Sequence, residues 1–241
     1  MHLIPFKGRN TSTYYNLNLL FQNGKTYIMD NHLAASWCWL QQIDIEKQYN
    51  LLHIDRHYDL LQSQIEWWIE ALQVQNIDLT SISITDLLSI RYEHKQMRTF
   101  KSQLFRFDNY LTIFLRLFPY LIDTAIFATH KDKKTTFDIP MLEPEIDELK
   151  ENLSAWINCN SNNKWIVNLD IDYFFKKDIK QERVQFLTDS AILKIAEEIR
   201  KSWDNIEVLT IALSPEYSGG WDSAERVARL ITEHLEVSWA I

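Results

Sequence analysis

Three residues with metal-binding side chains alternate between Leu51 and Leu60, namely Asp55, His57 and Asp59. A β-strand turns every second side chain to the same face, so an extended chain here would bring all three to one spot. The apolar residues before them suit a buried strand whose carboxyl end opens into a site, as is usual in open α/β sheets. The spacing therefore predicts a metal site at the end of this strand.

Two further segments pair an apolar run with polar ligands. Residues 165–174 begin as an apolar run that leads to Asp170 and Asp172. Two carboxylates at a buried strand end repel each other unless a proton or a cation intervenes. Residues 26–29 lead in the same way to His32. Each motif alone is common, but three of them at successive strand ends indicate one shared metal site.

Together the segments supply six candidate metal ligands: His32, Asp55, His57, Asp59, Asp170 and Asp172. Two divalent cations would neutralise the four carboxylates and leave one imidazole for each metal. Carboxylate-rich ligation favours manganese over zinc, which prefers nitrogen and sulfur ligands. We therefore expect two Mn²⁺ ions per chain. His53 would face the same side and support the ligands by hydrogen bonding rather than bind metal.

The order of these motifs resembles that of the ureohydrolase superfamily of arginases and agmatinases. His32 matches the family's first histidine ligand, although the glycines of its Gly-Gly-Asp-His segment are missing and Asn31 precedes the histidine. Residues 55–59 match the family's Asp-Ala-His-x-Asp motif, with Arg56 in place of alanine. Residues 168–172 match its Ser-x-Asp-x-Asp motif, with asparagine in the serine position.

The resemblance implies roles for single residues. It implies two bridging ligands and two terminal pairs, with Asp55 and Asp170 as bridges, His32 and Asp59 at one metal, and His57 and Asp172 at the other. Two adjacent metals would activate a water for attack on a guanidinium carbon, and Asp59 would also accept a hydrogen bond from the resulting hydroxide. Glu216 stands where the family keeps the glutamate that pairs with the substrate guanidinium. The proton donor for the leaving amine stays open between His94 and His130, since neither stands at the family's histidine position.

More narrowly, residues 30–32, 53–57 and 214–220 resemble the peptide arginases, which convert arginine side chains of ribosomal precursor peptides to ornithine. Free-arginine enzymes follow the second motif with a polar loop that reads the amino acid's own amino and carboxylate groups. Here residues 60–68 continue from Asp59 in a helical pattern without such a loop. The resemblance therefore implies a hydrolase of linear amidines that releases urea, with an arginine-containing precursor peptide as its partner.

Composition limits the class of protein. The 241 residues, 46% hydrophobic and 24% charged, suit one soluble α/β domain spanning residues 1–241. The net charge of −8 argues against nucleic acid and anionic membranes as partners and is compatible with a cationic substrate. Cys38 and Cys159 lack the spacing of a disulfide framework or zinc knuckle. Without a signal-like or membrane-length apolar run, the sequence predicts a cytoplasmic, unanchored protein, whether monomer or homo-oligomer.

Strand and helix patterns alternate without internal repeats, which predicts a three-layer αβα fold with a mostly parallel sheet. The resemblance narrows this to the arginase/deacetylase type. Asn-Gly between residues 14–21 and 25–29 predicts a hairpin. The other expected strands are 49–54, 124–129, 165–174 and 206–213. The expected helices are 34–47, 59–75, 109–117, 145–156, 186–203 and a last one beginning near Asp222, with Glu225 completing a capping box.

Several rival functions fit part of the pattern. A binuclear phosphoesterase would need further histidine motifs downstream, where only His234 follows His130. A glycosyltransferase that held a nucleotide-sugar through Asp170 and Asp172 would leave residues 55–59 without a role. A zinc deacetylase of the same superfold would need only one metal. A small-molecule ureohydrolase and a non-catalytic metal-binding domain stay open as alternatives to the peptide enzyme.

Overall fold

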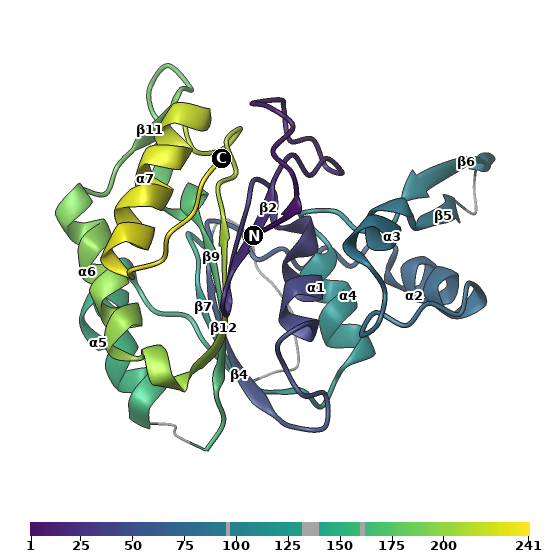
Figure 1. The fold of residues 1–241 in the computed structure, drawn as a ribbon, viewed down its shortest axis with the longest axis horizontal. Helices are drawn as coiled ribbons and strands as arrows, with labels where there is room; N and C mark the ends of the chain where they lie inside the picture. The colour runs from purple at the N-terminus through teal and green to yellow at the C-terminus, as the bar shows by residue number, and fades with distance from the viewer. Residues whose placement is uncertain (95–96, 132–139, 160–161) are drawn as a thin grey trace.

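The computed structural model describes residues 1–94, 97–131, 140–159 and 162–241. Within this part of the chain, an eight-stranded sheet with the order β1-β2-β3-β12-β9-β4-β7-β8 lies between two layers of helices (Figure 1). Its strands are β1 His2–Ile4, β2 Leu20–Asn23, β3 Thr26–Met29, β4 Tyr49–Ile54, β7 Ile122–Ala128, β8 Met141–Leu142, β9 Trp165–Asp170 and β12 Ile206–Ala212. The pairs from β3 to β8 are parallel, whereas β1, β2 and β3 pair antiparallel at one edge. The predicted three-layer fold with a mostly parallel sheet is confirmed.

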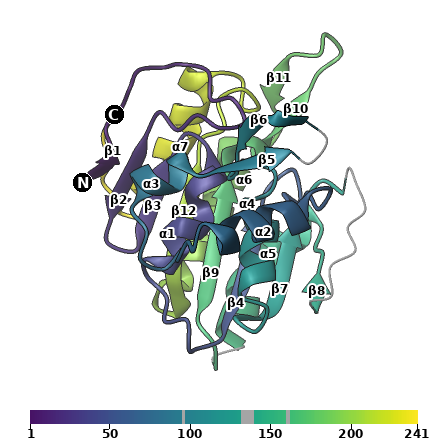
Figure 2. The same cartoon turned by 90° about the vertical axis from the view of Figure 1, so that its right-hand side faces the viewer.

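The helices divide between the two faces of the sheet. On one face lie α1 (Ala35–Leu40), α2 (Ile65–Val74), α3 (Ile84–Ser89) and α4 (Tyr110–Leu117), which Figure 2 shows in front of the sheet. The other face carries α5 (Ile146–Cys159), α6 (Asp189–Lys201) and α7 (Trp221–His234). Two small hairpins stand apart from the main sheet: β5 (Arg91–His94) with β6 (Met97–Gln103), and β10 (Phe175–Lys177) with β11 (Arg183–Gln185). None of the described helices has the length and apolar character needed to cross a membrane.

The layered packing explains the sequence pattern of the central strands. Every residue of β4 and β9 is buried, because helices cover both faces of the sheet there. The outer helices bury only one stripe, as in α7, where Ala224, Val227, Ala228 and Ile231 recur at helical spacing. The core therefore consists of two apolar clusters, one on each side of the sheet.

Two expected helices are shorter than their sequence patterns predicted. The helix predicted for residues 34–47 ends at Leu40. The helix predicted for residues 59–75 begins only at Ile65. Asp59 has a left-handed φ of 53°, and the N–H of Leu61 bonds to the carbonyl of Asp108, so the chain cannot enter a helix at once. Residues 59–64 therefore form an irregular segment, which corrects the prediction that no loop follows Asp59.

The predicted capping box of the last helix is also wrong. Gly220 occupies the N-cap position of α7, and no side chain caps the helix there. Asp222 and Glu225 both pair with Arg9, at 2.5 and 2.9 Å, so their carboxylates hold the N-terminal segment instead. Other boundaries moved by a few residues, as in α6, where Thr188 caps the helix by accepting the N–H of Ala191. The polar run Ser161-Asn162-Asn163 predicts a loop before β9, and Ser161 lies outside the described residues.

The central position of β9 leads to a prediction about stability. Leu169 is fully buried in this strand, so Leu169→Ala would leave a cavity between rigid layers. We expect the free energy of unfolding, measured by urea denaturation, to fall by about 2 to 5 kcal/mol. Val74→Ala, at a side chain that is 80% exposed on α2, should change it by less than about 0.5 kcal/mol. Similar losses in both variants would contradict a central β9.

Candidate metal centre

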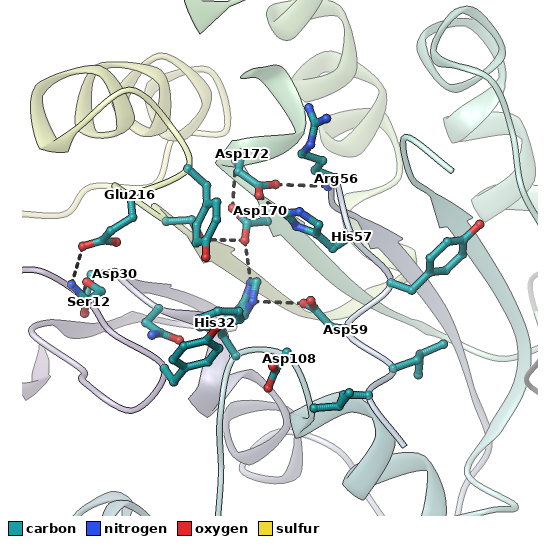
Figure 3. Close-up of a pocket in the computed structure, with 18 of the residues that line it drawn as sticks. Ser12, Asp30, His32, Arg56, His57, Asp59, Asp108, Asp170, Asp172 and Glu216 are labelled. Carbon is teal, nitrogen blue, oxygen red and sulfur yellow. Dashed lines mark hydrogen bonds and ion pairs between the residues drawn. The ribbon is translucent and has the colours of Figure 1, made fainter. Parts of the chain in front are cut away.

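Four adjacent strands bring the candidate residues to one edge of the sheet. His32 follows β3, Asp55 follows β4, Asp170 ends β9 and Glu216 follows β12. Because parallel strands share their carboxyl edge, these residues meet there, as in other open α/β sheets. His32, Asp170 and Glu216 line a pocket of about 410 Å³ together with His57, Asp59 and Asp172 (Figure 3), and Asp55 is fully buried next to these ligands.

The prediction that the ligand motifs lie on extended strands is wrong. β4 ends before Asp55, and Asp172 belongs to a 3₁₀ turn that follows β9. In each motif the first aspartate accepts a hydrogen bond from the backbone N–H two residues later. The N–H of His57 bonds to Asp55 Oδ1 at 2.6 Å, and the N–H of Asp172 bonds to Asp170 Oδ1 at 2.9 Å. Such turns compete with the strand ladder and end it.

The segment before His32 forms the same kind of side-chain turn. Asn31 Oδ1 accepts the N–H of Leu33 at 3.0 Å, which starts the 3₁₀ turn that carries His32. The asparagine that departs from the family's motif is therefore a functioning turn residue. All three ligand segments leave their strands through an Asx turn and project side chains into the same pocket.

His32 lies among three of the carboxylates. Its Nδ1 is 2.7 Å from Asp170 Oδ2 and 3.6 Å from Asp55 Oδ2, and its Nε2 is 3.1 Å from Asp59 Oδ2. Figure 3 shows His32, Asp59 and Asp170 pointing toward one another from three strand ends. The first proposed half of the site is thus assembled in the structure.

His57 lies on the other side of Asp55. Its Nδ1 is 3.2 Å from Asp172 Oδ2 and 3.6 Å from Asp55 Oδ1. Within the described chain, three groups of side chains place ligand atoms within 4.8 Å of one another: His32 with Asp55 and Asp170, His53 with Asp55 and Asp59, and Asp55 with His57 and Asp172. Asp55 belongs to every group, which is the position expected of a bridging ligand.

The buried carboxylates of the cluster are suited to bind a cation. Asp55 Oδ2 is buried and accepts no hydrogen bond from any described residue. Burial, and then the charges of Asp170 and Asp55, raises the pKa of Asp172 to about 7. Burial and the charge of Asp55 likewise hold the pKa of Asp59 well above its usual value. A positive ion at this place would offset the repulsion that otherwise keeps these groups from ionising.

The pKa values of the two imidazoles are raised as well, which for histidine favours the charged form. Burial opposes protonation of His32, but the carboxylates of Asp59 and Asp170 outweigh it and raise its pKa to about 10. His57 is raised to a pKa of about 11 by Asp172 and Asp55, again against burial. A metal ion must displace these protons, because histidine binds metal as neutral imidazole.

His53 makes hydrogen bonds beside the cluster, and its supporting role stays a prediction. It is fully buried, its Nδ1 accepts from Asn168 Nδ2 at 3.1 Å, and its Nε2 faces the carbonyl of His57 at 3.0 Å. Thr210 donates to Asn168 Oδ1 at 2.8 Å, which fixes the amide so that Nδ2 is the donor. His53 Nε2 therefore carries the proton and donates it to the carbonyl of His57. The same nitrogen lies 3.8 Å from Asp55 Oδ2.

Glu216 lies across the pocket from the ligand cluster (Figure 3). Its Oε1 accepts the backbone N–H of Ser12 at 2.5 Å, and burial raises its pKa. Ser12 also donates its hydroxyl to buried Asp30, which accepts the N–H groups of Asn18 and Leu19 at 2.7 and 2.8 Å. The N-terminal segment thus forms one wall of the pocket, a feature that sequence reasoning missed.

A wall of aromatic rings in the pocket also escaped sequence reasoning. Tyr14 stacks on Phe107 with 4.8 Å between ring centroids, and Phe107 meets Tyr217 edge to face at 5.9 Å. All three line the pocket. They come from distant segments and belong to no spaced motif, so only the folded chain brings them together. Tyr217 alone had a signal, since it lies within residues 214–220.

Of the two histidines considered as proton donors, only His130 has a side chain that the structure describes. His130 lies in a second, smaller pocket, where its Nε2 is 2.8 Å from the carbonyl of Tyr173. It is not among the residues that line the metal pocket. The side chain of His94 lies outside the described part of the structure.

Comparisons with known proteins gave fold-level similarities only. Neither a family model nor a curated protein matches the chain. Three solved structures are similar over 86% of the chain: proclavaminate amidino hydrolase from Streptomyces clavuligerus (13% identity, TM-score 0.46, 61% of that chain), a hypothetical agmatinase from Burkholderia thailandensis (14%, 0.44, 56%) and Helicobacter pylori arginase (12%, 0.42, 70%). This chain thus spans less than two thirds of the first two structures. Similarity at this level transfers no function.

Because Asp55 belongs to every group of ligands, its replacement should be the most damaging to metal binding. We expect Asp55→Asn to abolish binding of both Mn²⁺ ions, measured as metal content after manganese loading and dialysis. Asp108→Asn makes the same charge change at another residue of the pocket, outside the three groups, and should retain the metal content of the wild type. Wild-type metal content in Asp55→Asn would refute the bridging assignment.

Proposed function

We propose that this protein is a manganese-dependent hydrolase that converts arginine side chains of a precursor peptide to ornithine and releases urea. The observation that carries the proposal is the gathering of all six candidate ligands around Asp55, in a pocket whose far wall bears Glu216. Manganese bound there would supply Lewis acidity to activate water against the guanidinium carbon.

The proposed ligand roles are those that the resemblance implies, supported for the terminal pairs by the contacts of His32 with Asp59 and of His57 with Asp172. We assign two bridges and two terminal pairs, with Asp55 and Asp170 between the ions, His32 and Asp59 on one side, and His57 and Asp172 on the other. His53 holds the second motif in place through the carbonyl of His57. Asp59 has the further role of accepting a hydrogen bond from the attacking water.

Glu216 is the proposed contact for the substrate guanidinium. Ser12 holds one of its carboxylate oxygens, which leaves the other to pair with a guanidinium N–H. Glu216 is exposed, so a substrate can reach this free carboxylate oxygen. Glu216 would thereby hold the guanidinium with its carbon turned toward the ligand cluster.

The charge of the pocket favours a cationic substrate. The two proposed cations would neutralise the ligand carboxylates of the lining, which leaves Asp30, Asp108 and Glu216 as the pocket's other acidic residues. Arg56 also lines it, but its guanidinium donates to the carbonyl of Phe175 at 3.0 Å and points away from the cluster (Figure 3). A pocket of one sign concentrates ligands of the opposite charge. An arginine side chain meets this requirement.

The outer part of the pocket supports a peptide substrate. Tyr14 is 47% exposed and extends the aromatic wall toward solvent. The peptide residues on either side of the arginine would pack against it there. The irregular segment after Asp59 contributes Leu60, Leu61 and Gln62 to the lining. Two of these three side chains are apolar and cannot pair with a free α-carboxylate.

The same segment is the reason to retain a second candidate, a small-molecule ureohydrolase. The expectation of a peptide substrate depends partly on a helix following Asp59 at once, without a polar loop that reads the amino and carboxylate groups of free arginine, and the structure has an irregular segment there. Gln62 offers an amide donor in the pocket that could meet a carboxylate of free arginine. Substrate tests must therefore include both forms of arginine.

The role of Glu216 is tested by Glu216→Gln, which keeps the shape and removes the charge. We expect turnover to fall by roughly 10- to 100-fold, because hydrogen bonds to charged groups contribute about 1.5 to 3 kcal/mol, while manganese content stays at the wild-type level. Glu151→Gln, at an exposed residue of α5, serves as the control and should leave turnover unchanged. Normal urea release from Glu216→Gln would exclude the proposed contact.

The substrate class is tested with a peptide whose termini are blocked, such as acetyl-Gly-Arg-Gly-amide, beside free arginine and agmatine. Conversion of arginine to ornithine removes CH2N2, a loss of about 42 Da, together with release of urea, as expected for water attack on a guanidinium carbon. We expect this mass change in the peptide incubated with manganese-loaded protein. Hydrolysis of free arginine or agmatine with an unchanged peptide would favour the small-molecule enzyme. Metal binding without any hydrolysis would favour the non-catalytic domain.

A further inference from the structure

Three of the four cluster carboxylates are oriented by the backbone. Each accepts a backbone N–H through Oδ1: Asp55 from His57 at 2.6 Å, Asp170 from Asp172 at 2.9 Å, and Asp172 from Arg56 at 3.2 Å. Asp59 is the exception, since within the described chain no backbone N–H donates to its carboxylate. Its Oδ2 is buried without a hydrogen-bond partner among these residues, although it lies 3.1 Å from His32 Nε2.

Tyr110 places an unused hydroxyl beside this cluster. The residue is fully buried in the first turn of α4, and its ring lies 5.2 Å from that of His32 and 5.9 Å from that of Trp39. Its hydroxyl makes no hydrogen bond of normal geometry to any described residue, but the carboxylate of Asp59 lies close enough to act on it as a side-chain acceptor. A buried hydroxyl without a partner costs free energy, so its position beside an acceptor that also lacks one requires an explanation.

The electrostatics of the site keep this hydroxyl a donor. Burial, and then the nearby carboxylates of Asp59, Asp55 and Asp170, raises the pKa of Tyr110 well above its usual value. A higher pKa favours the protonated phenol, which can donate a hydrogen bond. The order of these carboxylates also places Asp59 as the strongest electrostatic neighbour of the hydroxyl.

We propose that Tyr110 is a positioning residue that donates a hydrogen bond to Asp59 and so orients this carboxylate for metal binding. The inference rests on the proposed metal site. Tyr110 would do for Asp59 what backbone N–H groups do for the other three carboxylates. Partners of this kind fix the orientation of a ligand and raise the affinity for the metal. The ring of Tyr110 meanwhile packs against His32, the other ligand assigned to the same ion.

The test uses Tyr110→Phe, which keeps the ring against His32 and removes only the hydroxyl. We expect one of the two Mn²⁺ ions to bind about 10- to 100-fold more weakly, measured by calorimetric titration with Mn²⁺, while the other binds as in the wild type. The melting temperature of the metal-free variant should not decrease, because the lost hydroxyl has no partner there. A decrease without weaker Mn²⁺ binding would overturn the proposal and indicate a packing role.

Tyr173→Phe is the matched control. Tyr173 is also fully buried and its hydroxyl also lacks a hydrogen-bond partner in the described chain, but it belongs to the opposite apolar cluster. We expect this variant to bind both ions as the wild type does. Equal weakening in the two variants would show a general effect of removing a buried hydroxyl and would overturn the specific role of Tyr110.

A double-mutant cycle tests whether Tyr110 acts through Asp59. In a protein in which Asp59→Asn has already weakened Mn²⁺ binding, adding Tyr110→Phe should change the Mn²⁺ affinity by less than about twofold, because the hydrogen bond between Tyr110 and Asp59 is already lost. Fully additive losses would overturn the proposal, as would wild-type binding by Tyr110→Phe alone. A wild-type protein that binds no Mn²⁺ would instead refute the proposed function, so the two failures are distinguishable.

Discussion

Four carboxylates and two imidazoles share one small buried volume at the carboxyl edge of the sheet. Placing like charges there is costly unless opposite charges accompany them. In the structure the imidazoles of His32 and His57 take that role, which is why their pKa values rise to about 10 and about 11. The surrounding fold holds the cluster in place despite this electrostatic repulsion, because the cluster lies between two apolar layers and is attached to fully buried central strands.

The features that follow from local apolar patterns could be predicted from the sequence. The strand at 49–54 agrees with β4, and the helix at 109–117 agrees closely with α4. Candidate ligands could be found because their spacing repeats at three strand ends. Their conformation could not, because one side-chain oxygen decides it: Asp55 captures the N–H of His57 and ends the strand. A period-two pattern looks the same in a strand and in an Asx turn.

Other features depend on contacts between residues far apart in sequence. Arg9 draws Asp222 and Glu225 away from a cap, and Ser12 reaches Glu216 across more than two hundred residues of chain. Neither pairing leaves a periodic signal in the sequence. The aromatic wall is similar, because its rings come from three segments that meet only after folding. Sequence patterns therefore described the ligand cluster better than the walls around it.

The Asx turns have a consequence for the kind of ion that the cluster can hold. Asp55 and Asp170 each commit Oδ1 to the backbone and turn Oδ2 toward His32, so the plane of each carboxylate is fixed. A fixed plane prevents the swing by which a carboxylate changes from one-oxygen to two-oxygen coordination. Ca²⁺ commonly relies on such adaptable, high-coordination shells. The turns thus restrict how Asp55 and Asp170 can coordinate an ion. This restriction favours ions smaller than Ca²⁺, independently of ligand chemistry.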